Sequence, residues 1–214
     1  MYFIPRFKVN AVTRVLVFVD FFYNFAFGSF GPIFAIFITQ QIFGGTAAVA
    51  GFATSVYWLT KSVLQLPIAR FLDKTDGERD DFWAMFLGYF LSGVTPFLYL
   101  LVHTPFQLYL AQAYLGFMMA WAVPAWYGIF TRHIDSGRES FEWSLESVFS
   151  VGLATAISAA LGGYLVDRFG FRWMLLVAGF LAMSASLFLI PLRKYLLPRR
   201  RHAKTIPLEH KDSF

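Results

Sequence analysis

The chain contains no cysteine and few charged residues, and each absence excludes some classes of protein. Without cysteine there are no disulfide bridges and no thiolate ligands for a metal. Charged residues make up 14% of the chain, whereas a soluble domain carries about 25%. No segment alternates polar and apolar residues over the roughly ten positions that a membrane-spanning β-strand requires. These absences argue against both a soluble domain and a β-barrel.

Long apolar runs occupy most of the chain instead. Hydrophobic residues account for 57% of it, and phenylalanine alone occurs 27 times. A transmembrane helix needs about 20 mostly apolar residues, and runs of that kind lie at 12–38, 47–69, 82–102, 106–130, 144–166 and 173–196. The sequence therefore predicts an all-α integral membrane protein with a six-helix transmembrane domain over residues 12–196. A short N-terminus, 1–11, precedes this domain and a basic tail, 197–214, follows it.

The basic residues outside these runs predict the orientation. Lys and Arg gather on the cytoplasmic side of membrane proteins. With six spans, fifteen of them fall on the side of the two termini and two on the other side. We therefore expect a multi-pass protein of the plasma (inner) membrane with both termini cytoplasmic. The basic tail is expected to contact anionic lipid headgroups rather than nucleic acid.

Two loops carry a family resemblance. The stretch LPIARFLDKTDGERDDFW resembles the signature loop between the second and third helices of the major facilitator superfamily, with Asp73, Lys74 and Arg79 at matching positions. Ala69 stands where that pattern has a glycine, and Gly77 comes one residue late. The stretch LGGYLVDRFGFRWMLLVAGF resembles the end of the fifth helix, the outer turn and the start of the sixth. The resemblance covers roughly residues 10–196 and implies one six-helix half of a transporter.

A half-size transporter implies a second half. Halves in this superfamily are parallel repeats, so we expect two copies to assemble around a two-fold axis. The resemblance implies that helix two of each copy meets helix five of the other. Small residues permit such close packing in lipid, and the candidates are Gly51, Ser55, Gly152, Ala156 and Ala160. The alternative is that these residues pack within one copy. In the dimer, Asp73 is expected to approach the start of the partner's fifth helix and to act in gating.

Two embedded charges are the main functional candidates. Asp20 lies inside the first run with Asn24 one turn later, and Lys61 lies inside the second at a similar expected depth. An ion pair between Asp20 and Lys61 is therefore expected. It either exchanges a proton during transport, with Glu146 as a second proton site, or serves as a permanent structural pair.

Other polar and aromatic residues have expected places. The substrate cavity is expected to be lined by Tyr23, Trp58, Gln65, Gln112 and Trp121. Trp126 and Tyr127 are expected as interfacial anchors, His133 as a surface residue, and the third helix, which has no charge, as lipid-facing.

The function expected is secondary active transport of a small solute by alternating access in a parallel homodimer, with proton coupling through Asp20. The alternatives are a subunit that needs a different partner half and a membrane scaffold that transports nothing. The sequence has no nucleophile with an oriented base, paired catalytic carboxylates or phosphate-binding glycine loop. We therefore expect no enzyme activity, no cofactor and no metal.

Overall fold

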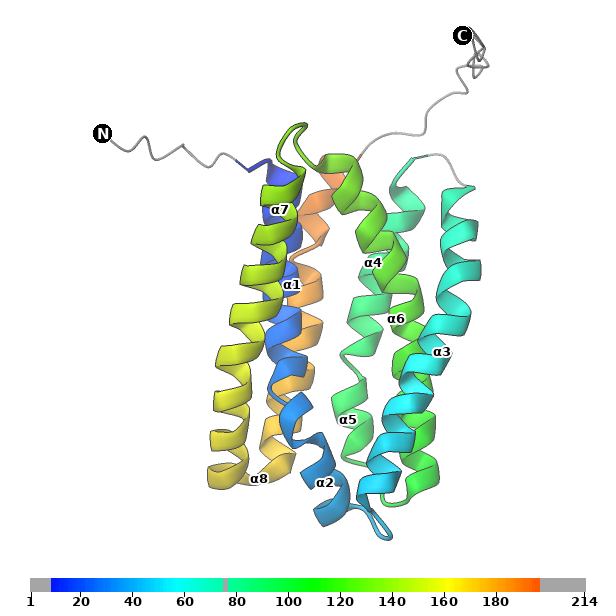
Figure 1. Ribbon diagram of the computed structural model, residues 1–214, viewed down its shortest axis with the longest axis vertical. Helices are drawn as coiled ribbons and strands as arrows, with labels where there is room; N and C mark the ends of the chain where they lie inside the picture. Colours follow the sequence, from blue (N-terminus) through cyan, green and yellow to red (C-terminus); the bar gives the residue numbers. More distant parts are fainter. Residues whose placement is uncertain (1–8, 75–76, 197–214) are drawn as a thin grey trace, which may run out of the picture.

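All secondary structure in the described part of the chain is helical. The computed structural model describes residues 9–74 and 77–196, so the first eight residues, two residues of the signature loop and the basic tail lie outside it. Figure 1 shows the helices running alongside one another as a bundle, with both described ends of the chain at the same end. The expectation of an all-α protein is confirmed for these residues.

The helices follow one another with short connections. In chain order they are α1 (Ala11–Gly28), η1 (Gly31–Ile33), α2 (Phe34–Gln41), α3 (Ala47–Asp73), α4 (Arg79–Ser92), α5 (Thr95–Tyr99), α6 (Pro105–His133), α7 (Glu139–Leu145), η2 (Glu146–Leu153), α8 (Ala154–Leu187) and η3 (Ile190–Lys194). Of these, η1 and η3 are 3₁₀-helices and η2 is a π-helix.

Side-chain caps set the start of three long helices. The backbone N–H of Thr13 donates to the side chain of Asn10 at 2.8 Å at the start of α1. Thr46 caps α3 in the same way. At α6, Thr104 and Gln107 form a reciprocal capping box directly around a proline at the first helical position. These caps satisfy N–H groups that would otherwise have no partner within the helix.

Glycine and proline interrupt the first and last helical segments. The first is broken between Gly28 and Phe34, where Gly31–Ile33, with Pro32 at its centre, form a single 3₁₀ turn. In the last, Gly170 has φ 80° and ψ 169°, which is outside the helical region, and the chain reverses there. Figure 1 shows the two arms of α8, yellow and orange, side by side. A left-handed φ of this kind suits glycine because it has no Cβ.

Four segments are long and apolar enough to cross a membrane. They are Ala11–Gln41, Arg79–Tyr99, Pro105–His133 and Glu139–Lys194. The last contains 56 residues and includes the break at Gly170. Helix α3 is 27 residues long, or about 40 Å, but it is less apolar and is not among the four.

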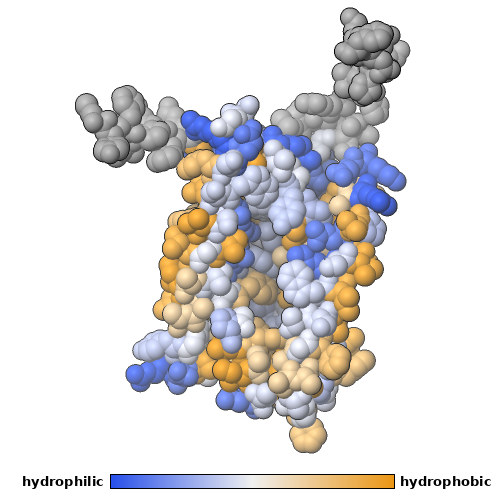
Figure 2. All heavy atoms as spheres, in the orientation of Figure 1, coloured by the Kyte–Doolittle hydropathy of each residue, from blue (hydrophilic) through white to orange (hydrophobic). Residues whose placement is uncertain are grey.

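Packing divides the bundle into two groups joined by α4. Helix α1 packs against α8 and η2, α3 packs against α6, and α4 packs against both α6 and α8. Gly162 of α8 lies directly against the backbone of Ser29, and Gly116 of α6 would bring a Cβ within 2.7 Å of the Tyr57 carbonyl oxygen. These glycines allow the helices of each group to approach closely. Figure 2 shows apolar surface along the flanks of the bundle and hydrophilic residues toward its ends.

Candidate functional site

Asp20 lies in a polar site on α1, inside the apolar bundle. It is 7% exposed, and its carboxyl oxygens accept hydrogen bonds from the Tyr89 hydroxyl at 3.0 Å and the Asn24 amide at 2.8 Å. Asn24 lies one helical turn from Asp20, so both side chains share one face of α1. Tyr89 comes from α4 and joins the two groups of helices at this point.

A second carboxyl group, that of Glu146, belongs to the same site. Glu146 is half-buried and lines the same cavity as Asp20. It is the first residue of the π-helix η2, which runs from Glu146 to Leu153. π-Helical turns are rare and often lie at functional sites. Nothing in the sequence pattern signals this change of winding.

Tyr23 forms a second polar contact beside the carboxyl pair. Its hydroxyl lies 2.6 Å from the Ser92 hydroxyl and 3.1 Å from the Met119 sulfur. Its ring lies 4.4 Å from the ring of Tyr89, centroid to centroid. The hydroxyl groups and the carboxyl pair therefore belong to one connected cluster of α1, α4 and η2.

These side chains enclose a cavity of about 170 Å³. It is lined by Asp20, Tyr23, Asn24, Tyr89, Met119, Val123, Trp126, Tyr127, Glu146 and Val151. A polar cavity within membrane-spanning helices costs free energy, because buried polar groups must be paired or hydrated. Polar groups at such positions therefore usually serve a function.

Residues 16–212 match the family model of the Major Facilitator Superfamily. The chain belongs to the Major Facilitator Superfamily. Members of the superfamily are transporters rather than enzymes, and the apolar helices agree with a multi-pass membrane protein. A search of curated proteins found no sequence that matches the chain significantly.

The predicted ion pair between Asp20 and Lys61 is wrong. Asp20 accepts hydrogen bonds from Tyr89 and Asn24, and the Lys61 ammonium lies 4.8 Å from the centre of the Trp58 ring. The physical reason is that α1 and α3 belong to different groups of helices. Equal depth along two helices brings side chains together only when the helices are neighbours.

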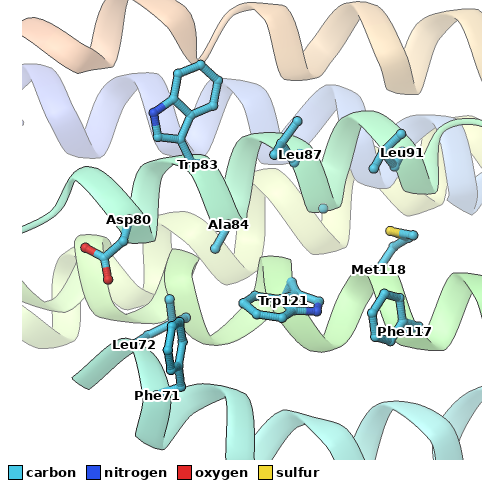
Figure 3. Close-up of a pocket in the computed structure, with 11 residues that line it drawn as sticks. Phe71, Leu72, Asp80, Trp83, Ala84, Leu87, Leu91, Phe117, Met118 and Trp121 are labelled. Carbon is cyan, nitrogen blue, oxygen red and sulfur yellow. The ribbon is translucent and has the colours of Figure 1, made fainter. Parts of the chain in front are cut away.

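The residues expected to line the substrate cavity lie in several different parts of the structure. Tyr23 lines the cavity beside Asp20, whereas Trp58 is 54% exposed on α3, Gln65 is half-buried on α3 and Gln112 is buried on α6. Trp121 lies elsewhere, in a separate apolar groove that Figure 3 shows.

The groove in Figure 3 has a volume of about 570 Å³ and lies between α3, α4 and α6. Trp121 faces it together with Trp83, Phe71 and Phe117, and Asp80 lies at one end. Trp121 is two residues from Met119 and Val123, which line the carboxyl cavity. Opposite faces of α6 therefore line the two spaces.

The environments expected for Trp126 and for the third helix are wrong. Trp126, expected as an interfacial anchor, is 4% exposed and lines the cavity, where Tyr127 joins it. The third helix was expected to face lipid, but Tyr89 and Ser92 of α4 are buried in the polar cluster. An uncharged helix still places tyrosine and serine hydroxyls on one face, and that spacing is the signal that sequence reasoning missed.

A buried ionic network ties the helix ends together beside the signature loop. The Arg132 guanidinium at the end of α6 pairs with Glu78 at 2.8 Å and also with Asp81. His133, expected as a surface residue, lies 2.9 Å from Glu78. Glu78 and Asp81 are both buried, so the carboxylates of the network lie in the protein interior, while the Arg132 side chain also reaches the surface.

The signature residues lie around this network. Asp73 is the last residue of α3, Lys74 follows it, Arg79 begins α4, and all three are exposed. Among the described residues, none of the three belongs to an ion pair of the network.

A second buried carboxylate anchors α7. Glu142 is fully buried and accepts a hydrogen bond from the Thr13 hydroxyl at 2.9 Å. The backbone N–H of Asp135 donates to the other oxygen of Glu142 at 3.3 Å. Glu142 therefore holds the start of α1 against α7, a role that its position in a first helical turn did not reveal.

The small residues expected at a dimer interface are exposed in the single chain. This applies to Gly51 and Ser55 on α3, Gly152 on η2, and Ala156 and Ala160 on α8. A Cβ placed at Gly51 would have no atom within 4 Å. Packing within the chain therefore leaves this set of positions free.

Proposed function

We propose that the protein is a secondary active transporter that moves a small solute by alternating access. In this proposal it works as a parallel homodimer and couples transport to protons through Asp20. The observation that carries the proposal is the Asp20–Glu146 carboxyl pair, which lies in a cavity between membrane-spanning helices. Acidic groups at such positions commonly serve as proton relays.

The proposed topology has six spans with both termini cytoplasmic. It counts α3 as a span and divides the segment Glu139–Lys194 at the Gly170 reversal. The length of α3 supports this count, because about 40 Å exceeds the 30 Å hydrocarbon core. The bias of Lys and Arg toward one end supports the orientation.

The proposed dimer interface joins α3 of one copy to η2 and α8 of the other. Its support is the exposed small residues on both faces: Gly51 and Ser55 on one, and Gly152, Ala156 and Ala160 on the other. Small side chains let helix backbones approach, and van der Waals packing then drives association in lipid. Helix α3 has a broad exposed surface because it packs chiefly on α6.

A gating role for the signature loop goes with this dimer. Asp73 is exposed at the end of α3, so it is free to approach the start of α7 in the partner. A carboxylate near a helix N-terminus is stabilised by about 0.3–1 kcal/mol. Contacts of this size hold one conformation closed without preventing it from opening.

There are two alternatives to a homodimeric transporter, namely a subunit that needs a different partner half and a scaffold that transports nothing. A different six-helix chain would cover the exposed faces of α3 and α8 as well as a second copy would. A scaffold that transports nothing would have no need for a carboxyl pair in a cavity, so the cavity favours transport.

The first experiment tests alternating access without knowledge of the substrate. The absence of cysteine allows single-cysteine variants to be labelled with a membrane-impermeant maleimide in right-side-out and inverted vesicles. Val123→Cys, in the cavity wall, is expected to react from both sides. Phe43→Cys and Ser136→Cys, exposed in loops at opposite ends of the bundle, are the controls and should each react from one side. Reaction of Val123→Cys from one side at every pH would contradict alternating access.

The second experiment tests the homodimer. A copy with Ser55→Cys and one tag is co-expressed with a copy that has Ala156→Cys and another tag, and a short bismaleimide is added. A product that contains both tags is expected, and neither variant expressed alone should give it. Unlinked chains, with both cysteines shown to react with a monofunctional maleimide, would argue for a different partner half.

A further inference from the structure

The carboxyl pair holds one negative charge and one proton. Asp20 and Glu146 line one cavity of about 170 Å³ whose lining contains no Lys, Arg or His to neutralise them. Two carboxyl groups that share a small, low-dielectric site do not both ionise, so one of them keeps its proton. Tyr89 and Asn24 donate neutral hydrogen bonds to Asp20, so they stabilise the negative charge but do not cancel it.

The walls of the cavity suit a positively charged group. The lining contains Asp20 and Glu146 but no Lys, Arg or His. It also contains the aromatic rings of Tyr23, Tyr89 and Trp126, and ring faces attract cations. The cavity is therefore negative and aromatic at the same time.

One buried hydrogen-bond donor in the cavity wall has no acceptor. Trp126 is 4% exposed, and its indole Nε1 has no hydrogen-bond partner among the described residues. A buried N–H group without an acceptor costs about 1–3 kcal/mol. A ligand that brings an acceptor to this N–H recovers that free energy.

We propose that the transported solute is a small monovalent organic cation with a hydrogen-bond acceptor, and that it replaces the proton shared by Asp20 and Glu146. The proposal rests on the transport function proposed above and names its substrate class. The ammonium group lies between the two carboxylates and the aromatic rings, and its acceptor meets the Trp126 N–H.

The exchange balances in charge. Before exchange, the pair carries one proton and a net charge of −1. When the cation binds, the proton leaves to solvent, and two carboxylates plus one cation again sum to −1. Because the net charge in the cavity is constant, exchange avoids the cost of adding or removing a charge there. The reverse step returns one proton for each cation released.

The donor set argues for an organic cation over a metal ion. Among residues 9–74 and 77–196, no cluster of three or more His, Asp or Glu side chains could hold a metal. Calcium takes six to eight oxygen ligands and magnesium six. Aromatic rings, a thioether and two valine side chains line much of this cavity instead.

Isothermal titration of the full chain in detergent tests the proposal with three probes. Choline has a cationic head and a hydroxyl acceptor, tetramethylammonium has the head alone, and 3,3-dimethylbutan-1-ol is the neutral counterpart of choline. Choline is expected to bind with release of one proton, counted from the dependence of the heat on buffer ionisation. Its affinity should fall about tenfold for each unit of decreasing pH while the pair is protonated, because one proton competes with one cation. The neutral alcohol should not bind.

Two variants assign the effects to residues. In Glu146→Gln the amide donates to Asp20 and favours its ionised form. Choline should then bind without proton release and without the pH dependence. Glu139→Gln, an exposed carboxylate on α7, is the control and should keep both. Trp126→Phe keeps the ring and removes the N–H, so it should lower the affinity for choline several-fold and leave that for tetramethylammonium unchanged.

The outcomes separate this proposal from the transport function. If Val123→Cys reacts from both sides but neither cation binds, the substrate class is wrong and the transporter stands. Binding of the neutral alcohol as tightly as choline, or choline binding without proton release in the unsubstituted chain, would also overturn the proposal. If Val123→Cys reacts from one side only, the transport function fails whatever the cations do.

Discussion

Arg132→Met is expected to destabilise the protein strongly by leaving two buried carboxylates without their cation. Arg132 pairs with Glu78, which is 1% exposed, and with Asp81, which is also buried. His133 also pairs with Glu78, and it is charged only when protonated. Removing the guanidinium therefore leaves negative charge in a site with little water.

The size of the effect follows from the burial of both sides. Breaking a fully buried ion pair by removing one partner costs about 3–5 kcal/mol. The Arg132 side chain is 38% exposed, so water screens part of its interaction and the lower end of that range applies. We expect a loss of about 3 kcal/mol, which is a factor of more than 100 in the unfolding equilibrium.

The assay is equilibrium unfolding in SDS, followed by tryptophan fluorescence. Arg172→Gln, which removes an exposed guanidinium from α8, is the control and should change stability by less than about 0.5 kcal/mol. The triple variant Arg132→Met, Glu78→Gln, Asp81→Asn has no uncompensated charge and should recover most of the loss. If the triple variant is as unstable as Arg132→Met alone, stranded charge is not the cause and the reasoning is refuted.

Two further predictions concern helix contacts. Gly116→Ala should lower the unfolding free energy by about 1–3 kcal/mol, because its Cβ would meet the Tyr57 carbonyl oxygen at 2.7 Å, whereas Gly163→Ala has open space and should have no measurable cost in the same SDS titration. Equal effects of the two substitutions would show that α3 and α6 do not approach as described. Thr13→Val removes the donor to buried Glu142 and should cost about 1–3 kcal/mol, while Thr13→Ser keeps the hydroxyl and should cost far less. A loss as large for Thr13→Ser would assign the effect to packing of the methyl group.

The helical class and the family were accessible from sequence because they depend on local composition. Long apolar runs predict helices in lipid wherever they occur, and the loop around Asp73 and Lys74 carries the resemblance that the family model confirms. Asp20 was also visible as an isolated charge in an apolar run. These signals need no knowledge of which helices are neighbours.

The partners of Asp20 were not accessible, because they depend on that knowledge. Lys61 looked like the natural counter-ion from depth alone, but α3 packs on α6 and α1 packs on α8. The spacing of Tyr89 and Ser92 places both hydroxyls on one face of α4, but it does not reveal that this face meets the carboxyl group of Asp20. Glu78 looked like part of a charged loop and proved fully buried.

The π-helical winding of η2 has a mechanical consequence. This segment begins with Glu146, which lines the cavity, and contains Gly152, which is exposed on the outer face of the bundle. A π-helix has more residues per turn than an α-helix. A return to α-helical winding would therefore rotate everything on one side of η2 relative to the other. Glu146 in the cavity and Gly152 on the outer face thus belong to the same helical segment. A rotation of that segment that withdraws Glu146 from the cavity also turns the surface that contains Gly152.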